Sequence, residues 1–326
     1  MFIFSLFLTI YLKMKNKVSI IVPVYGVEKY IERCARSLFE QTFKDIEYIF
    51  VNDCTKDNSM SILENVIKDY PYRNIRIINK VSNEGLPQAR KTGVLASTGN
   101  YIMHIDSDDW VDLNIVEKLY LKAIEEDADM VCCDWTEEYG DKSIVCHQQP
   151  MSTSEYYKSI LHFKSFAYAW NRLTRRELYD DIEFPISYML EDFVITSQLV
   201  SKSNKICFLC EALNHYSKMN SGQSMSEEKR KSNMIQKVSN IFFVWNLLNS
   251  SSKKDTYREE LDNMVYYMLS ICLWDRIISD VDNKILGTLI KELRHLRITK
   301  NNNNTLIQQL LIKFYFCTSL YKLIYR

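Results

Sequence analysis

YIMHIDSDDW, residues 101–110, joins a short apolar run to a cluster of acidic side chains. The apolar part has the length of a buried β-strand, and Asp106, Asp108 and Asp109 follow at its end. Carboxylates this close repel one another, and a divalent cation, which prefers carboxylate oxygens, is the usual reason for a fold to hold them together. A polar turn accounts for the same residues, because Asp and Ser are common in turns. On this stretch alone both interpretations stay open.

Before this stretch, segments with the apolar pattern of a β-strand alternate with segments that have the apolar period of a helix. Buried β-strands are predicted at residues 18–25, 46–51 and 75–78 and from residue 101. Helices are predicted between them, at residues 27–41, 59–69 and 88–97. Strands that alternate with helices form right-handed βαβ units, so the sequence predicts an α/β fold with a mainly parallel sheet.

Polar side chains gather where three of these strands end. The pairs are Tyr25 with Glu28, Asn52 with Asp53, and Asp106 with Asp108. Ligands of such sheets bind beyond the carboxyl ends of the strands, so one shared edge predicts one site. Neither glycine-rich phosphate motif follows the first strand, so a nucleotide bound here would depend on a metal and on side chains.

The pattern is weaker after residue 112. A helix is predicted at 113–126 and strands at 129–135 and 205–213. Residues 166–173, FAYAWNRL, fit a helix whose solvated basic face includes Arg172, Arg175 and Arg176, although a functional segment stays an alternative. Residues 188–194, YMLEDFV, place two acids in a helix-like run, as the N-terminus of a helix often does.

The C-terminal third is helical by period and poor in chemically active side chains. Apolar faces recur near 232–249, 256–279, 283–296 and 305–326. The last of these is a basic amphipathic helix, which suits an anionic membrane surface or a place packed on the domain. We expect a domain at 14–220, with halves 14–112 and 113–220, and a helical region at 221–326 that contacts the membrane surface peripherally.

Composition limits the choice of partners and compartment. The chain has 41 basic and 41 acidic residues, so net charge gives no sign of a nucleic-acid partner. Nine cysteines without a framework fit a reducing, cytoplasmic location. Cys132 and Cys133 are expected in the core, and Cys207 and Cys210 are expected as packed thiols rather than a zinc site.

The first residues raise a separate question. Residues 1–12 are apolar but too few to span a membrane, and the lysines follow the run instead of preceding it. We expect Met14 to be the natural start of the protein. A weak interfacial anchor is the alternative.

Four segments share one further pattern: residues 18–25, 51–59, 83–93 and 99–110. Together they resemble the inverting family-2 glycosyltransferases of bacterial surface-polysaccharide synthesis, which have the GT-A fold. The resemblance implies transfer of a sugar from a nucleotide diphosphate, typically a UDP-sugar, to a hydroxyl of a glycan or lipid-linked glycan. It also implies Mn²⁺ or Mg²⁺ as cofactor and a location on or near the cytoplasmic face of the membrane.

The resemblance also implies roles for individual residues. Asp108 would hold the metal, with Asp106 and, least securely, His215 beside it. Asp192 would be the general base, paired with Glu191, and residues 170–173 would lie near the acceptor. Contacts with the nucleotide are implied for Pro23, Val24, Tyr25, Glu28, Asn52, Asp53, Asn83, Arg90, Asp106 and Ser107.

Four residues at three places depart from the family pattern, and two other functions are alternatives. Gly26, Cys54-Thr55 and Lys91 replace the usual Asn, Gly-Ser and Asn, which leaves the fine nucleotide contacts open. A non-catalytic sugar-nucleotide binder is one alternative. A nucleotidyltransferase is another, although the glycine-rich first loop usual in that class is absent.

Overall fold

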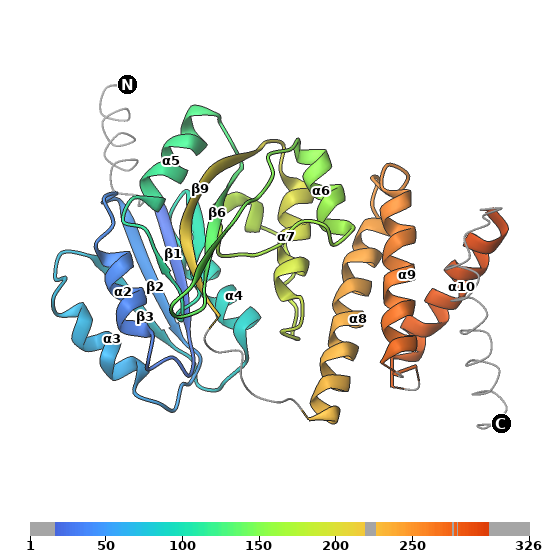
Figure 1. The fold of residues 1–326 in the computed structure, drawn as a ribbon, viewed down its shortest axis with the longest axis horizontal. Coiled ribbons are helices and arrows are strands. Elements are labelled where there is room, and N and C mark those ends of the chain that lie inside the picture. Colours follow the sequence, from blue (N-terminus) through green and yellow to red (C-terminus); the bar gives the residue numbers. More distant parts are fainter. Residues whose placement is uncertain (1–16, 219–225, 276, 279, 300–326) are drawn as a thin grey trace, which may run out of the picture. The chain divides into compact units, whose positions relative to one another are not determined.

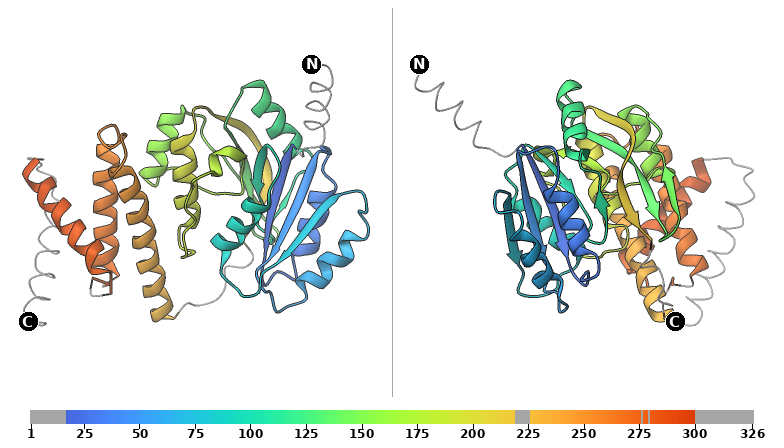
Figure 2. Two further views of the ribbon diagram at one scale, coloured as in Figure 1. Left: turned by 180° about the vertical axis from the view of Figure 1, so that it is seen from behind. Right: turned by 60° about the vertical axis from the view of Figure 1, so that its left-hand side comes forward.

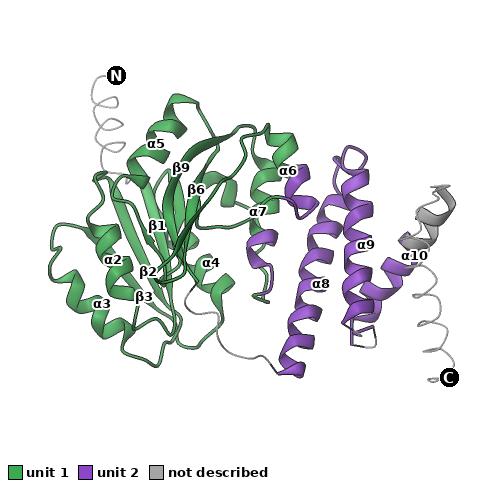
Figure 3. Cartoon of the chain, in the orientation of Figure 1, with its two compact units in different colours: residues 1–157, 165–188, 195–222 green, residues 158–164, 189–194, 223–326 purple. Residues whose placement is uncertain are grey.

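A computed structural model describes residues 17–218, 226–275, 277, 278 and 280–299. The chain divides into two compact units (Figure 3). Unit 1 comprises residues up to 157 together with 165–188 and 195–222, and unit 2 comprises 158–164, 189–194 and the residues from 223 on. The domain limits expected from the sequence, 14–220 and 221–326, stay a prediction.

Unit 1 is built on one mixed β-sheet (Figure 1). Its strand order is β3-β2-β1-β4-β8-β6-β9-β5, and β7 pairs with β6 beside this path. The first four strands are β1 (Val18–Val24), β2 (Ile46–Asn52), β3 (Asn74–Asn79) and β4 (Tyr101–His104), and they are mutually parallel. The others are β5 (Trp110–Val111), β6 (Met130–Glu138), β7 (Ser143–Cys146), β8 (Arg172–Arg175) and β9 (Ile206–Ser217). The predicted α/β class with a parallel N-terminal sheet is confirmed.

Helices cover both faces of this sheet (Figures 1 and 2). Alternate residues of β1 pack with α2 (Ile31–Phe39), α3 (Ser59–Ile67) and α5 (Ile115–Glu125) in the main core. On the other face, α4 (Leu86–Ala96) packs its Ala89 on Ile49 and Val51. The unit also contains η1 (Arg176–Tyr179) and parts of α6 (Thr153–Leu161) and α7 (Glu191–Lys202).

Gly93 allows α4 to approach β1 closely. A Cβ at this position would lie 2.3 Å from Cγ2 of Ile21, so any larger residue would push the helix off the sheet. One turn earlier on the same helix is Arg90, whose side chain is fully buried. The close approach therefore fixes where the Arg90 guanidinium can reach.

Unit 2 consists mainly of helices. They are α8 (Glu227–Asn249), α9 (Arg258–Trp274) and α10 (Asn283–Thr299). Buried polar pairs tie the unit together, among them Glu260 with His162 at 3.5 Å. No helix in the described ranges has both the length and the apolar character needed to cross a bilayer. The predictions for residues 1–13, a start at Met14 or a weak interfacial anchor, and for the basic amphipathic helix at 305–326 concern residues outside the described ranges.

Two structural expectations were wrong. Residues 166–173 do not form a helix, because irregular backbone with a turn at residues 170–171 leads into β8, which pairs with β4 and β6. Arg172 is not solvated but 1% exposed, because it lies on an inner strand. Cys132 and Cys133 are buried as expected, whereas Cys207 is only partly buried and Cys210 is exposed on β9.

Candidate active site

The carboxyl ends of the parallel strands form one edge, as predicted. Val24 lies opposite Asn52, and Asn52 lies opposite Asn79. Strand β4 ends earlier, but the amide of Ile105 still donates to the carbonyl of Ile21 at 3.0 Å. The loops that follow these strands therefore begin side by side.

Asp53 anchors the loop that follows β3. Its Oδ1 accepts from the amide of Glu84 at 3.1 Å, and its Oδ2 accepts from the amide of Gly85 at 2.8 Å. The ammonium group of Lys80 lies 3.1 Å from Oδ1. Asp53 is 3% exposed, so its carboxylate is a buried acceptor that holds the loop after β3 in place.

The two asparagines predicted for nucleotide contact also support these loops. Asn52 donates from Nδ2 to Oδ1 of Asn79 at 2.8 Å and accepts from the amide of Thr55 at 2.9 Å. Asn83 accepts from the amide of Gly85 at 3.1 Å. Both side chains hold the backbone from which a ligand would be bound.

The loop after β1 offers one large open side chain. Tyr25 is 51% exposed, whereas Pro23 and Val24 are buried in the strand. Glu28 accepts from the amide and the side-chain Nδ2 of Asn58, at 3.0 and 3.2 Å, next to the start of α3. Of these four predicted nucleotide contacts, Tyr25 presents the clearest surface.

A buried arginine holds the first acid of the turn after β4. The guanidinium of Arg90 donates to Oδ1 of Asp106 at 2.7 Å, and Arg90 itself has no exposed surface. Arg90 thus reaches the site through Asp106. His104, also buried, lies near this arginine, and burial lowers the pKa of its imidazole well below the usual value.

The third acid of the turn is tied to a distant strand. Oδ1 of Asp109 accepts from the amide of Ser217 at 2.8 Å, which links the turn to the end of β9. Asp109 has no exposed surface, and burial, together with Asp106 and Asp108, raises its pKa to about 9. Ser107 is also buried, and Asp106 and Asp108 are the partly exposed members of the turn.

A three-layer stack braces the same turn. The Arg33 guanidinium lies 3.4 Å from the ring centre of Trp110, and the His215 ring stacks on Trp110 with centroids 4.9 Å apart and planes 3° apart. Nδ1 of His215 lies 2.8 Å from Oε1 of Glu138, and Nε2 lies 3.1 Å from Oδ1 of Asp112. Both ring nitrogens of His215 thus have carboxylate partners.

Glu191 and Asp192 occupy the first turn of α7, the helix N-terminus that the sequence predicted. Both belong to unit 2. Glu191 is buried and Asp192 is partly exposed. The residue before them, Leu190, has a φ of 59°, a left-handed conformation that costs a non-glycine residue free energy and is frequent at functional sites.

The acidic turn suits a divalent cation that also binds a substrate. In the described chain no group of three His, Cys, Asp or Glu side chains could hold a metal ion unaided. Mg²⁺ and Mn²⁺ commonly use one or two carboxylates and complete their shells with water and substrate phosphates. The partly exposed Asp106 and Asp108 fit that demand.

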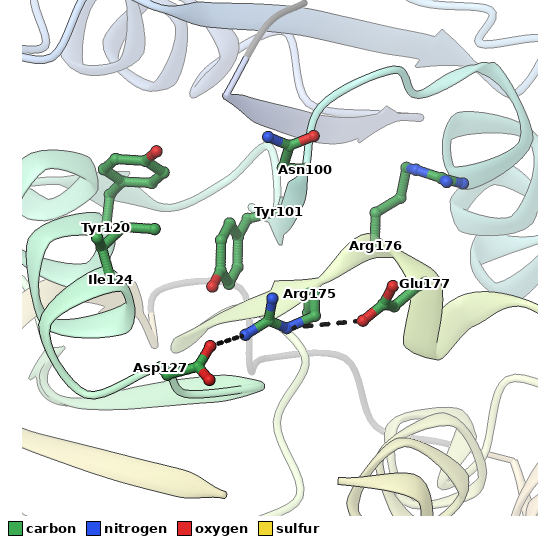
Figure 4. A pocket seen from close by; sticks show the side chains of 8 residues that line it. All are labelled: Asn100, Tyr101, Tyr120, Ile124, Asp127, Arg175, Arg176 and Glu177. Carbon is green, nitrogen blue, oxygen red and sulfur yellow. Dashed lines mark hydrogen bonds and ion pairs between the residues drawn. The ribbon is translucent and has the colours of Figure 1, made fainter. Parts of the chain in front are cut away.

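A separate pocket of about 430 Å³ lies at the opposite end of the strands. Its lining includes Asn100, Tyr101, Tyr120 and Arg175 (Figure 4). The Arg175 guanidinium is paired with Asp127 at 2.9 Å and with Glu177 at 3.8 Å, so its charge is already balanced. None of the predicted site residues lines this pocket.

Sequence reasoning missed several members of the site. They are Arg33, Lys80, Asp112 and Glu138. No motif marks Arg33, Asp112 and Glu138, because they reach the acidic turn only through packing on Trp110 and His215.

The fold and the acidic edge define a sugar-transferring enzyme of the α/β class, and comparison with known sequences agrees. Residues 19–183 match Glycosyl transferase family 2, so the chain belongs to this family. It is 32% identical over 216 residues to Glycosyltransferase GlyA of Streptococcus pneumoniae, covering 62% of this chain and 30% of GlyA. It is 30% identical over 271 residues to Putative glycosyltransferase EpsH of Bacillus subtilis, covering 78% of this chain and 76% of EpsH.

Solved structures agree on the fold. S. aureus TarS 1-349 superimposes with a TM-score of 0.57 at 20% identity, over 84% of this chain and 86% of that one. TarS has also been solved with UDP. Mannosyltransferase PcManGT of Pyrobaculum calidifontis, in complex with GDP-Man and Mn²⁺, has a TM-score of 0.54 at 13% identity, over 96% of this chain and 81% of that one. The predicted GT-A fold is confirmed.

Proposed function

We propose that this glycosyltransferase moves a sugar from a nucleotide-diphosphate donor, a UDP-sugar, to a hydroxyl of a glycan or lipid-linked glycan with inversion. The observation that carries the proposal is the edge shared by Tyr25, Asp53 and the Asp106–Asp109 turn. The complexes of TarS with UDP and of PcManGT with GDP-Man support a nucleotide sugar as donor.

The loops after β1 and β2 are assigned to the nucleoside. Tyr25 offers an exposed ring against which a base can pack. Each oxygen of the Asp53 carboxylate has two lone pairs, so a base N–H can share an oxygen that already accepts a backbone amide. Asn52 and Asn83 keep the surrounding backbone in place.

The acidic turn is assigned to the diphosphate. Mn²⁺ or Mg²⁺ held by Asp108, with Asp106 beside it, would stabilise the negative charge that grows on the leaving diphosphate, a contribution of several kcal/mol. Arg90 orients Asp106, since its buried guanidinium donates to Oδ1 of that carboxylate. The presence of Mn²⁺ in PcManGT favours this choice of cofactor.

Asp192 is assigned as the base that takes the proton from the acceptor hydroxyl, a contribution of about 10²–10⁴-fold in rate. Its position in the first turn of α7, next to the buried Glu191, supports the assignment. In this scheme no covalent intermediate on the protein is needed, because a single displacement inverts the anomeric carbon.

His215 is assigned a positioning role. Its stack on Trp110 and its two carboxylate contacts would hold the acidic turn against β9. The metal-ligand role implied by the family resemblance is the alternative. It would require His215 to give up Asp112 or Glu138.

The test is UDP release from a panel of UDP-sugars, with and without Mn²⁺, on the full chain. We expect at least one donor to be hydrolysed or transferred in a metal-dependent way. Clear UDP binding without turnover of any donor would favour a non-catalytic binder. Release of diphosphate from a sugar 1-phosphate and a nucleoside triphosphate would instead identify a nucleotidyltransferase.

A further inference from the structure

The loops that follow β1 and β2 are joined by a set of hydrogen bonds that the proposed reaction does not yet use. Three successive backbone amides of the first loop, at residues 26–28, each donate to a side chain of the second loop. In that order, the acceptors are Oγ1 of Thr55 at 2.9 Å, Oγ of Ser59 at 3.0 Å and Oδ2 of Asp57 at 3.0 Å. We call these three side chains the clamp.

Asp57 sets the direction of these hydrogen bonds. Its Oδ1 accepts from Oγ1 of Thr55 at 2.8 Å and from Oγ of Ser59 at 2.6 Å. Each hydroxyl has one hydrogen and an ionised carboxylate can only accept, so both hydroxyls donate to Asp57. Their lone pairs are then left for the amides of Gly26 and Val27. A single carboxylate thus orders the whole set.

The same contacts keep the Asp57 carboxyl group ionised. Partial burial opposes ionisation, but hydrogen bonds from the side chains of Ser59 and Thr55 and from the amides of Glu28 and Ser59 lower its pKa below the usual value. The pattern of donors and acceptors in the clamp therefore persists across the neutral pH range.

Tyr25 lies between two points at which the backbone is tied to the loop after β2. On its N-terminal side, the amide of Asp53 donates to the carbonyl of Val24 at 3.1 Å. On its C-terminal side the clamp holds residues 26–28, and Gly26 has a φ of 71°, which lets the chain turn there. Tyr25 is 51% exposed, so its ring is presented to solvent from backbone that is held on both sides.

A fourth side chain joins the loops in the opposite direction. Oε2 of Glu28 accepts from the amide of Asn58 at 3.0 Å and from its Nδ2 at 3.2 Å. The amide of Thr55 donates to Oδ1 of Asn52 at 2.9 Å, which continues the set to the end of β2. Neither loop can therefore shift alone without breaking several hydrogen bonds.

We propose that Asp57, acting through Thr55 and Ser59, is a positioning residue for the donor, because the clamp holds the Tyr25 loop beside Asp53 in the arrangement that the nucleoside requires. This inference rests on the proposed function, in which Tyr25 and Asp53 contact the base. A site that is already in its binding geometry loses little conformational entropy when the ligand arrives. The clamp acts on the nucleoside and not on the reacting atoms, so it sets donor affinity rather than the rate of transfer.

The experiment measures UDP affinity by calorimetry, and kcat and KM for the most active UDP-sugar, on the full chain. Thr55→Val keeps the shape of the side chain but removes the hydroxyl, which leaves the Gly26 amide and one bond to Asp57 unmade. UDP affinity should fall and KM should rise about 5–10-fold, with kcat within about 2-fold, as the loss of one or two hydrogen bonds predicts. Asp57→Asn, whose amide nitrogen cannot accept, should behave in the same way.

Two matched variants separate the clamp from general damage. Thr55→Ser keeps the hydroxyl and should bind UDP within about 2-fold of the wild type. Thr42→Val makes the same change ahead of β2, at the opposite end of the strand, where the hydroxyl donates to Oε2 of Glu117 at 2.7 Å. It should leave UDP affinity unchanged, and chemical denaturation shows whether the two valine substitutions cost comparable stability.

UDP affinity and KM equal to the wild-type values in Thr55→Val would overturn the positioning role, even if the variant lost stability. A fall in kcat with unchanged KM would overturn it as well, because the effect would then lie on the transfer step. So would an equal loss of UDP affinity in Thr55→Ser, since the hydroxyl would then not matter. Failure of the proposed function is distinct: wild-type protein that binds UDP but turns over no donor would contradict that function and leave the affinity comparison intact, whereas wild-type protein that binds no UDP would overturn both.

Discussion

The two halves of unit 1 hold their polar side chains in different ways. In the half built on β1–β4, the partners of Asp53 and Glu28 come from loops at the ends of neighbouring parallel strands. In the half built on β6, β8 and β9, contacts join distant segments, such as Asp109 with Ser217 and His215 with Asp112. The edge at the ends of β1–β4 is thus assembled by repeated βαβ geometry, whereas the contacts of the acidic turn with β9 form only when β9 pairs with β5.

The largest expected effect falls where the two halves meet. Asp108→Ala should lower metal-dependent UDP release by at least about 10³-fold, because the leaving diphosphate loses its bound cation. Steady-state UDP release with Mn²⁺ measures this. Asp141→Ala, at an exposed turn between β6 and β7, is the control and should retain wild-type rates. A fully active Asp108→Ala protein would remove the metal role.

Asp192 tests the assignment of the general base. Asp192→Asn should lower turnover by about 10²–10⁴-fold while UDP affinity stays unchanged, because only the proton acceptor is lost. Turnover from single-time-point transfer assays and UDP affinity from calorimetry give the two values. Loss of UDP affinity would reassign Asp192 to donor binding.

Arg90 tests the link between α4 and the acidic turn. Arg90→Gln leaves Asp106 without its buried cation, and breaking such a pair typically costs about 3–5 kcal/mol when both groups are buried. Because Asp106 is 24% exposed in its side chain, we expect about half of that loss in the free energy of unfolding. Chemical denaturation measures it, and turnover should fall about 10–100-fold. Unchanged stability would mean that water replaces Arg90 as partner of Asp106.

The sequence predicted the fold of the half built on β1–β4 well, because its contacts join neighbouring strands. Strand ends of a parallel sheet share an edge, so Asp53 and Asp106 could be placed together from their positions in the chain. The helix predicted at residues 166–173 is wrong, because an aromatic run with arginines does not indicate which strand will pair with it. Arg172 became buried only through the pairing of β8 with β4 and β6, and Tyr216 of β9 lies beside Trp170 although 46 residues separate them in the chain.

His215 sharpens the comparison, since it joins the acidic turn to β9. If it positions the turn, His215→Gln should lower turnover about 10-fold and leave Mn²⁺ affinity within about 3-fold of wild type in the presence of UDP. Electron paramagnetic resonance of Mn²⁺ measures the affinity without turnover. Trp110→Leu, which removes the stacking partner, should behave in the same way. A 100-fold loss of Mn²⁺ affinity confined to His215→Gln would make it a metal ligand.

The smallest expected effect lies at Cys54, in the half built on β1–β4, where the chain departs from the pattern of its family. Cys54 has a φ of 60°, and its thiol lies 4.0 Å from the carbonyl oxygen of Val81. A non-glycine residue in the left-handed conformation costs about 1–2 kcal/mol of stability, which glycine would save. Glycine also raises the conformational entropy of the unfolded chain, which lowers stability by about 0.4–1 kcal/mol. Cys54→Gly should therefore raise the free energy of unfolding by about 0–1 kcal/mol with UDP affinity unchanged, whereas Cys54→Ala, which keeps the strain, should not. Destabilisation by Cys54→Gly would mean that the thiol contact, and not the backbone, holds this loop beside Asp53.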